Sequence, residues 1–147
     1  MIQESDPVIE KLEREIWFLE ACKHKHIVNF YESFIHGMNL FIVMEYCSSG
    51  SLQDLLWKFH KKGLAFKEAH IAIIMWQLLD GLKYLHSTGK IHRDIKSANI
   101  LLTEDAMIKI ADFGVSAEIS NTITRWDSLV GTPHMMAPEM FLAQKYN

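Results

Sequence analysis

The chain of 147 residues is 49% hydrophobic and 22% charged, which is typical of a soluble globular domain with enough apolar residues for one core. Its net charge of −3 argues against nonspecific binding to nucleic acid or to an anionic membrane surface. The apolar runs at residues 40–44 and 71–76 are too short to span a bilayer, and two cysteines without metal-ligand spacing are typical of a reduced protein, so we expect a cytoplasmic location without a membrane span.

The first predicted element is a helix over about residues 7–21, where apolar side chains recur at helical spacing. Its apolar stripe consists of Ile9, Leu12, Ile16 and Leu19. Ser5 or Asp6 can cap this helix, and Pro7 suits its first turn. Glu15 lies beside the stripe, close to the side that we expect to be buried.

A hairpin and two helices are predicted next. Residues 27–46 are rich in β-branched and aromatic residues and are interrupted at 36–39, which indicates a hairpin whose second strand, residues 40–44, is buried on both faces. A short helix follows near residues 51–59, and the strongest helical periodicity runs over residues 67–86. The apolar positions of this long helix, which we expect to pack on a core, are Ile71, Ile74, Met75, Leu78, Leu82 and Leu85.

The pattern after the long helix is one of short strands and loops. Residues 100–102 and 107–110 flank a turn and predict a second, smaller hairpin. From residue 112 onward no periodicity is sustained, and we expect a long loop followed by a short helix. A stretch of that length without regular structure is uncommon in a compact domain unless it is functional.

Ionisable and amide side chains alternate with apolar residues in the loop that follows the long helix. Asp94, Lys96 and Asn99 lie in this loop, and Asp112 comes directly after the second hairpin. Two carboxylates and a carboxamide on neighbouring loops can organise Mg²⁺ and an anionic substrate, because Mg²⁺ prefers oxygen ligands together with phosphate. Taken alone, Asp94 also fits a turn or helix cap, and Glu15 also fits a solvated helix charge.

The combination of motifs resembles the eukaryotic protein kinases. Four motifs carry the resemblance: His-Arg-Asp with Lys and Asn at residues 92–99, Asp-Phe-Gly at 112–114, Gly-Thr-Pro at 131–133 and Ala-Pro-Glu at 137–139. They occur in family order and spacing, and the resemblance covers essentially the whole chain. It implies an α+β, protein-kinase-like fold that is truncated, with part of the N-lobe over residues 1–46 and the first half of the helical C-lobe over residues 47–147.

The resemblance implies a role for each polar residue of the two loops. Asp94 would accept or orient the substrate hydroxyl, and Lys96 would neutralise the γ-phosphate during transfer. Asn99 and Asp112 would hold the Mg²⁺ ions that bridge the phosphates of ATP. His92 would be structural, packing on Phe113 and bonding to backbone.

The resemblance also implies an ATP site between the lobes. Glu15 would pair with the lysine that anchors ATP, and the hinge segment from Glu45 to Cys47 would bond the adenine edge through its backbone. Met44 would be the gatekeeper behind the adenine, and Leu101 would form the floor beneath the ring.

Several residues resemble one kind of kinase in particular. Lys96 and Thr132, the latter in the substrate-docking segment, are typical of enzymes that phosphorylate serine and threonine in protein substrates. The strings at residues 112–117 and 130–139 are similar to the sterile-kinase group, especially its germinal-centre branch, which implies an intracellular signalling cascade. Ser128 lies where that group carries its activating phosphorylation by an upstream kinase, and its phosphate could pair with Arg93. His134 and Met135 depart from the family pattern, which leaves the substrate preference open.

Two features of the family are not found in this sequence. Neither a Gly-rich phosphate loop nor a Val-Ala-Ile-Lys strand precedes the first helix, and the ATP-anchoring lysine would lie at or just before Met1. We therefore expect a partial domain with weak nucleotide binding and an exposed apolar patch on the long helix. The alternative is a catalytically inactive, kinase-like binding or scaffold module. A small-molecule phosphotransferase is disfavoured by the Gly-Thr-Pro and Ala-Pro-Glu motifs.

Overall fold

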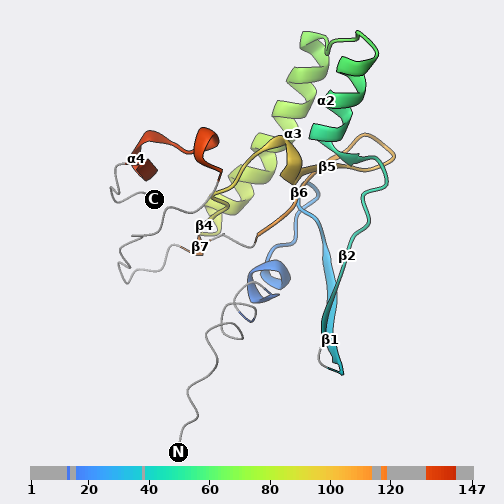
Figure 1. Cartoon of the computed structure of the whole chain (residues 1–147). Helices are drawn as coiled ribbons and strands as arrows, with labels where there is room; N and C mark the ends of the chain where they lie inside the picture. Colours follow the sequence, from blue (N-terminus) through green and yellow to red (C-terminus); the bar gives the residue numbers. More distant parts are fainter. Residues whose placement is uncertain (1–12, 14–15, 38, 114–116, 119–131, 142–147) are drawn as a thin grey trace, which may run out of the picture.

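The computed structural model describes residues 13, 16–37, 39–113, 117–118 and 132–141 (Figure 1). Residue 13 and residues 16–21 are helical, in agreement with the predicted first helix, whose remaining residues lie outside the described part of the chain. Phe18, Leu19 and Cys22 of this region are buried. The predicted α+β class is confirmed, since helices and small antiparallel sheets alternate along the chain.

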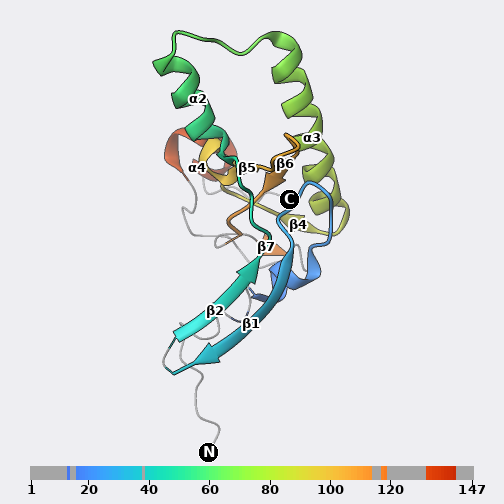
Figure 2. The same ribbon diagram turned by 90° about the vertical axis from the view of Figure 1, so that its right-hand side faces the viewer.

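The first hairpin consists of β1 (Phe30–His36) and β2 (Asn39–Met44), which pair antiparallel. The hairpin prediction is therefore confirmed, but the expected burial of residues 40–44 on both faces is wrong, because Phe41 and Met44 are each 44% exposed. Within the described residues, β2 pairs only with β1, in a two-stranded sheet that extends from one end of the molecule (Figures 1 and 2). A two-stranded sheet without a covering layer cannot bury both faces of a strand.

Both predicted helices are present. Helix α2 (Leu52–Lys61) begins at a capping box in which Ser51 Oγ accepts a hydrogen bond from the amide of Asp54 and the Asp54 carboxylate accepts one from the amide of Ser51. Helix α3 (Glu68–Ser87) is the long helix of the prediction. None of the helices in the described ranges is both long enough and apolar enough to cross a membrane.

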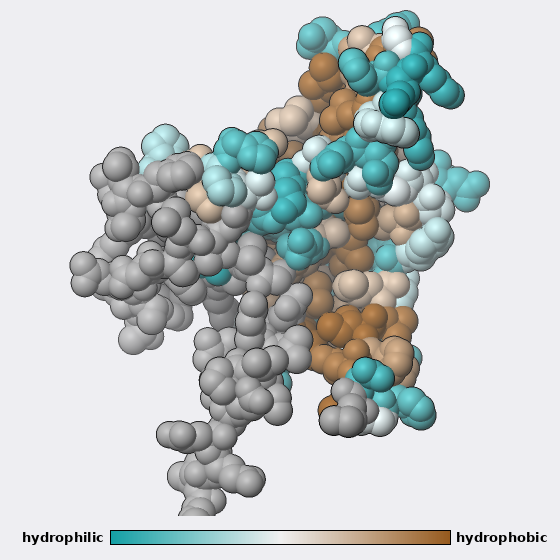
Figure 3. Space-filling model, viewed as in Figure 1, coloured by the Kyte–Doolittle hydropathy of each residue, from teal (hydrophilic) through white to brown (hydrophobic). Residues whose placement is uncertain are grey.

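Only part of the predicted apolar face of α3 is buried. Leu78 and Leu85 lie in the core, whereas Ile71 and Met75, which we expected to pack there, are 42% and 44% exposed. The first half of α3 extends away from the short strands, together with α2 (Figures 1 and 2), and of its predicted apolar positions only Ile74 packs against the core. Exposed apolar side chains gather along α3 and over the β1–β2 hairpin (Figure 3).

The short strands form two further sheets. Strands β3 (Gly50–Ser51), β5 (Ile100–Leu102) and β6 (Ile108–Ile110) form an antiparallel sheet, and β5–β6 is the predicted second hairpin. Strand β4 (Lys90–Ile91) pairs with β7 (Ala117–Glu118). The 3-10 helices η1 (Ser97–Asn99) and η2 (Pro133–Met135) and the short helix α4 (Pro138–Phe141) complete the described elements.

The core lies where residues 18–22, α3 and the β5–β6 hairpin meet. Its buried apolar side chains are Phe18, Leu19, Cys22, Ile27, Leu78, Leu85, Ile100, Leu102, Ile108, Ile110 and Phe113. Gly81 allows α3 to approach β6, since a Cβ atom there would lie 2.8 Å from Ile110 Cδ1. The backbone of Ile110 bonds to His26 and Val28, at 2.9 and 3.0 Å, which fixes β6 against the segment before β1. The loops at the ends of β4, β5 and β6 are thereby held on one packed core.

Candidate active site

His92 joins the two loops that the sequence singled out. Its side chain is 1% exposed, its Nε2 lies 2.9 Å from the carbonyl of Ala111, and its ring packs on Phe113 with 5.0 Å between centroids. The amide of Asp94 donates to His92 Nδ1 over 3.3 Å. A neutral imidazole with its proton on Nε2 satisfies both contacts, and burial is the main cause that lowers the pKa of His92. The structural role expected of His92 agrees with these contacts.

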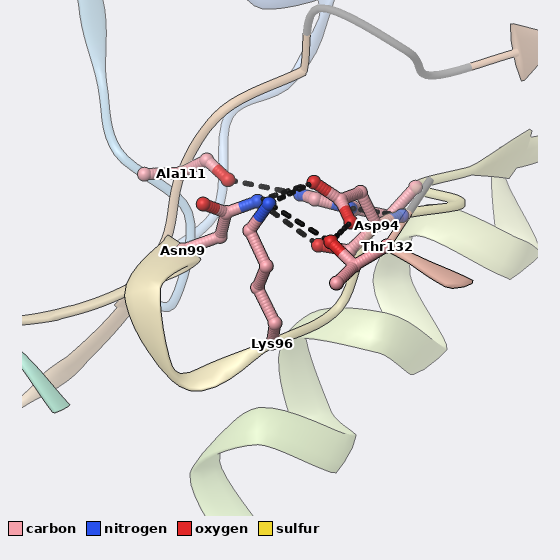
Figure 4. A network of polar contacts seen from close by, with 6 residues as sticks. Asp94, Lys96, Asn99, Ala111 and Thr132 are labelled. Atoms are coloured by element: carbon pink, nitrogen blue, oxygen red, sulfur yellow. Dashed lines mark hydrogen bonds and ion pairs between the residues drawn. The ribbon is translucent and has the colours of Figure 1, made fainter. Parts of the chain in front are cut away.

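The carboxylate of Asp94 is the centre of a buried polar network (Figure 4). Its Oδ2 accepts from Lys96 Nζ at 2.6 Å and from Asn99 Nδ2 at 3.0 Å. Its Oδ1 accepts from the Thr132 hydroxyl at 2.6 Å, and that hydroxyl in turn accepts from Lys96 Nζ at 3.0 Å. The structure therefore brings Asp94, Lys96, Asn99 and Thr132 together, although Thr132 comes from a distant part of the chain.

The network keeps Asp94 ionised. Burial alone raises the pKa of its carboxyl group, but the hydrogen bonds from Lys96, Thr132 and Asn99 outweigh that effect and hold the pKa below its ordinary value. The side chain of Asp94 is 9% exposed, so these donors act on a charge that is largely removed from water. Asp94 is thus a fixed, negatively charged acceptor at neutral pH.

A backbone hydrogen bond brings the segment that contains Asp112 beside Asn99. Asn99 Nδ2 donates to the carbonyl of Asp94 and to its carboxylate, at 3.0 Å each, so the amide oxygen is directed away from the network (Figure 4). The amide of Ala111 donates to the carbonyl of Asn99 over 2.9 Å, which places Asp112, the next residue, beside η1. Asp112 has an exposed side chain and a φ of 66°, in the left-handed region. An amide oxygen and an exposed carboxylate on adjoining segments are a donor set that suits Mg²⁺.

The residues expected around adenine lie at the junction of β2 and the three-stranded sheet. Met44 ends β2, and Leu101 in β5 pairs with Ser51. Cys47 is buried, and burial raises the pKa of its thiol, which keeps it protonated. The carboxylate of Glu45 is engaged in hydrogen bonds within the protein, and its backbone amide donates to the carbonyl of Asn29, so a ligand could bond this residue only through its backbone carbonyl.

Sequence reasoning missed two residues at this junction and could not place two others. Lys109 and Asn29 both bond to the Glu45 carboxylate. The one signal in the sequence for Lys109 is a charged residue between two isoleucines of a short strand. Glu15 and Ser128 lie outside the residues that the structure describes.

Residues 2–147 match the family model described as "Protein kinase domain". The chain is 48% identical over 139 residues to Serine/threonine-protein kinase pakG of Dictyostelium discoideum, which covers 94% of this chain and 12% of that protein. It is 46% identical over 134 residues to Mitogen-activated protein kinase kinase kinase kinase 3 of Homo sapiens, with 91% of this chain and 14% of that protein covered. It is 44% identical over 140 residues to Serine/threonine-protein kinase ste20 of Aspergillus fumigatus, with 95% and 17% covered.

The chain therefore spans less than a fifth of the length of each of these three relatives. Their names confirm the serine/threonine type and the sterile-kinase group that the sequence motifs resemble. Together with the match over residues 2–147, they show that the chain belongs to the protein kinase domain family.

Proposed function

We propose that the protein containing this chain is a protein serine/threonine kinase that transfers the γ-phosphoryl group of ATP to serine or threonine hydroxyls of protein substrates in a cytoplasmic signalling cascade. The observation that carries the proposal is the hydrogen bond from the Thr132 hydroxyl to Asp94 Oδ1. A hydroxyl of the same chemical kind as the acceptor substrate already binds to the carboxylate that would orient it.

In this proposal Asp94 positions the attacking hydroxyl. The ionised carboxylate accepts the hydroxyl proton in a hydrogen bond and aims the oxygen at the phosphorus, and it takes the proton as the new O–P bond forms and the bond to the leaving diphosphate breaks. Positioning of this kind is the main requirement, because phosphoryl transfer proceeds through a loose transition state with little covalent involvement of the protein. The donors that lower the pKa of Asp94 also fix the direction of its lone pairs.

Lys96 supplies positive charge beside the same carboxylate. Its Nζ lies 2.6 Å from Asp94 Oδ2, and in this proposal the ammonium group would lie beside the phosphoryl oxygens as they approach the acceptor hydroxyl. A fixed cation at this position would stabilise the negative charge that develops on those oxygens in the transition state, and it would do so more strongly than surrounding water could. Thr132, which bonds to both Lys96 and Asp94, would fix the ammonium group and the carboxylate relative to each other.

Asn99 and Asp112 would hold Mg²⁺ through the amide oxygen and the carboxylate. Mg²⁺ held by these two residues would supply positive charge to offset the negative charge of the ATP phosphates. The segment from Glu45 to Cys47 would bond adenine through its backbone, with Met44 behind the ring and Leu101 below it. These five assignments rest on the family resemblance and on the positions described above.

Two further residues belong to the proposal through the resemblance alone. Glu15 would pair with an ATP-anchoring lysine, and Ser128 would be phosphorylated by an upstream kinase. The division at residues 46 and 47 into N-lobe and C-lobe parts has the same basis.

Nucleotide binding separates this proposal from a kinase-like scaffold. We expect Mg-ATP to raise the melting temperature of the complete protein, and we expect Asp112→Ala to abolish the Mg²⁺-dependent part of that increase. Asp105→Ala, at an exposed turn, serves as the matched control and retains the increase. The scaffold alternative would be favoured if the wild type shows no increase in melting temperature, or if the Mg²⁺-dependent part of the increase persists in Asp112→Ala.

A further inference from the structure

The carboxylate of Glu45 is bound by two segments that are far from it in the sequence. Lys109 Nζ, from β6, lies 2.8 Å from Oε1 and 2.9 Å from Oε2. Asn29, just before β1, donates to Oε2 from its side chain at 2.9 Å and from its backbone amide at 3.1 Å. The amide of Glu45 donates to the carbonyl of Asn29 over 2.8 Å, so this residue is fixed through both its backbone and its side chain.

The ion pair between Glu45 and Lys109 is removed from solvent. The side chain of Lys109 is 6% exposed and that of Glu45 is 18% exposed. Burial raises the pKa of Glu45, but the hydrogen bonds from Lys109 and Asn29 outweigh this effect and leave the pKa below its ordinary value. A buried ion pair adds little net stability over apolar side chains of similar volume, yet it tolerates only a narrow geometry. Its main consequence here is therefore the fixed position of Glu45.

Strand β6 connects this position to the rest of the site. Lys109 is directly opposite Leu101 in the β5–β6 pair, so the two side chains lie on one face of the sheet. Two residues later, Ala111 bonds to Asn99 through its amide and to His92 through its carbonyl. One strand thus links the hinge segment to the loop that carries Asn99.

We propose that Lys109 is a positioning residue for the nucleotide: by holding the Glu45 carboxylate, it fixes the backbone of residues 45–47 at the distance and angle that adenine requires. The inference rests on the proposed function, in which this backbone bonds the adenine edge. Adenine presents an amino donor where guanine presents a carbonyl acceptor, so a correctly placed backbone discriminates between the two bases. A displaced backbone loses that discrimination, whereas the contacts to the phosphates stay in place.

The test compares the steady-state kinetics of the complete wild-type protein with those of Lys109→Met, Glu45→Gln and the double variant. We expect each single variant to raise the KM for ATP about tenfold, the equivalent of about one hydrogen bond, and to lower the preference for ATP over GTP by a similar factor. The kcat at saturating ATP and the inhibition constant of magnesium tripolyphosphate should stay within about twofold of wild type, because phosphate contacts do not involve this pair. The double variant should show no larger effect than either single variant, since both changes break the same contact.

The control is Lys25→Met, which removes a half-exposed lysine paired with Asp80 at 3.0 Å and should leave the ATP preference unchanged. If Lys109→Met fails to fold, Glu45→Gln, which keeps the shape of the side chain, decides the matter. An unchanged ATP preference in a folded variant, or a loss of kcat and of tripolyphosphate binding in parallel with ATP binding, would overturn the inference. A wild-type protein that shows no phosphotransfer would refute the proposed function instead, so the two failures are distinguishable.

Discussion

The side-chain hydroxyl of Thr132 donates a hydrogen bond to Asp94 Oδ1 over 2.6 Å, so a residue of the segment expected to dock substrate contacts the residue expected to orient the substrate hydroxyl. The same hydroxyl accepts a hydrogen bond from Lys96 over 3.0 Å. Thr132 is therefore the group that aligns the ammonium of Lys96 and the carboxylate of Asp94.

Thr132→Val keeps the shape of the side chain and removes its hydroxyl. We expect kcat/KM to fall about tenfold, because Asp94 and Lys96 each lose one hydrogen bond and their alignment loosens. Thr132→Ser restores the hydroxyl and should retain most of the activity. Steady-state phosphorylation of a protein substrate measures both variants, and equal activity of the valine and wild-type proteins would show that the hydroxyl has no role in alignment.

The depressed pKa of Asp94 predicts how stability depends on pH. The unfolded carboxyl group titrates at about 3.9, and the folded one has a lower pKa, so the stabilisation from this group is fully present above the unfolded pKa. It is lost as the pH falls through the folded pKa. Melting temperatures between pH 7 and pH 3 should therefore fall less steeply below about pH 4 in Asp94→Asn than in the wild type. Parallel curves would show that the network does not bind the carboxylate preferentially in its charged form.

Gly81→Ala tests the close packing of α3 on β6. The added Cβ would lie 2.8 Å from Ile110 Cδ1 and 3.2 Å from His26 Cβ, so the strand or the helix must shift. We expect the free energy of unfolding to fall by about 1–3 kcal/mol, despite the higher helix propensity of alanine. Urea denaturation of the complete protein measures the change. A higher free energy of unfolding in Gly81→Ala would mean that α3 and β6 can move apart without loss of stability.

His92→Leu tests the connection between the two loops. It leaves the amide of Asp94 and the carbonyl of Ala111 without the imidazole that bonds both, at a cost of about 1–3 kcal/mol in stability. Phosphotransfer should fall as well, because Asp94 and Asp112 are no longer fixed relative to each other. His36→Leu, on the exposed end of β1, is the matched control and should behave like the wild type in both assays. Wild-type activity and stability in His92→Leu would contradict this role.

Much of the fold could be predicted because its signals are local. The periodicity of residues 67–86 and the Ser51 capping box define helices α3 and α2 without reference to other elements. The β-branched runs on either side of short turns define both hairpins. The four motifs indicate the family for a chemical reason and not a structural one, because phosphoryl transfer requires residues of these types at this spacing.

The features that could not be predicted depend on contacts between distant parts of the chain. Phe41 and Met75 have the composition of core residues, and their exposure depends on which other elements cover them. The pair of Glu45 with Lys109 depends on the register of β6 against the segment after β2, which no local pattern specifies. The motif predicts that Thr132 lies in the substrate-docking segment, but its contact with Asp94 follows only from the three-dimensional arrangement.

Phosphotransfer by Asp94→Asn in the complete protein tests the role of this carboxylate. This substitution keeps the size of the side chain and removes the charge that accepts the substrate hydroxyl. We expect kcat to fall by about 10²–10⁴-fold, the usual contribution of a positioned proton acceptor, while Asp105→Asn at the exposed turn keeps wild-type kcat. Phosphotransfer by Asp94→Asn at the wild-type rate would show that Asp94 neither orients the substrate hydroxyl nor accepts its proton.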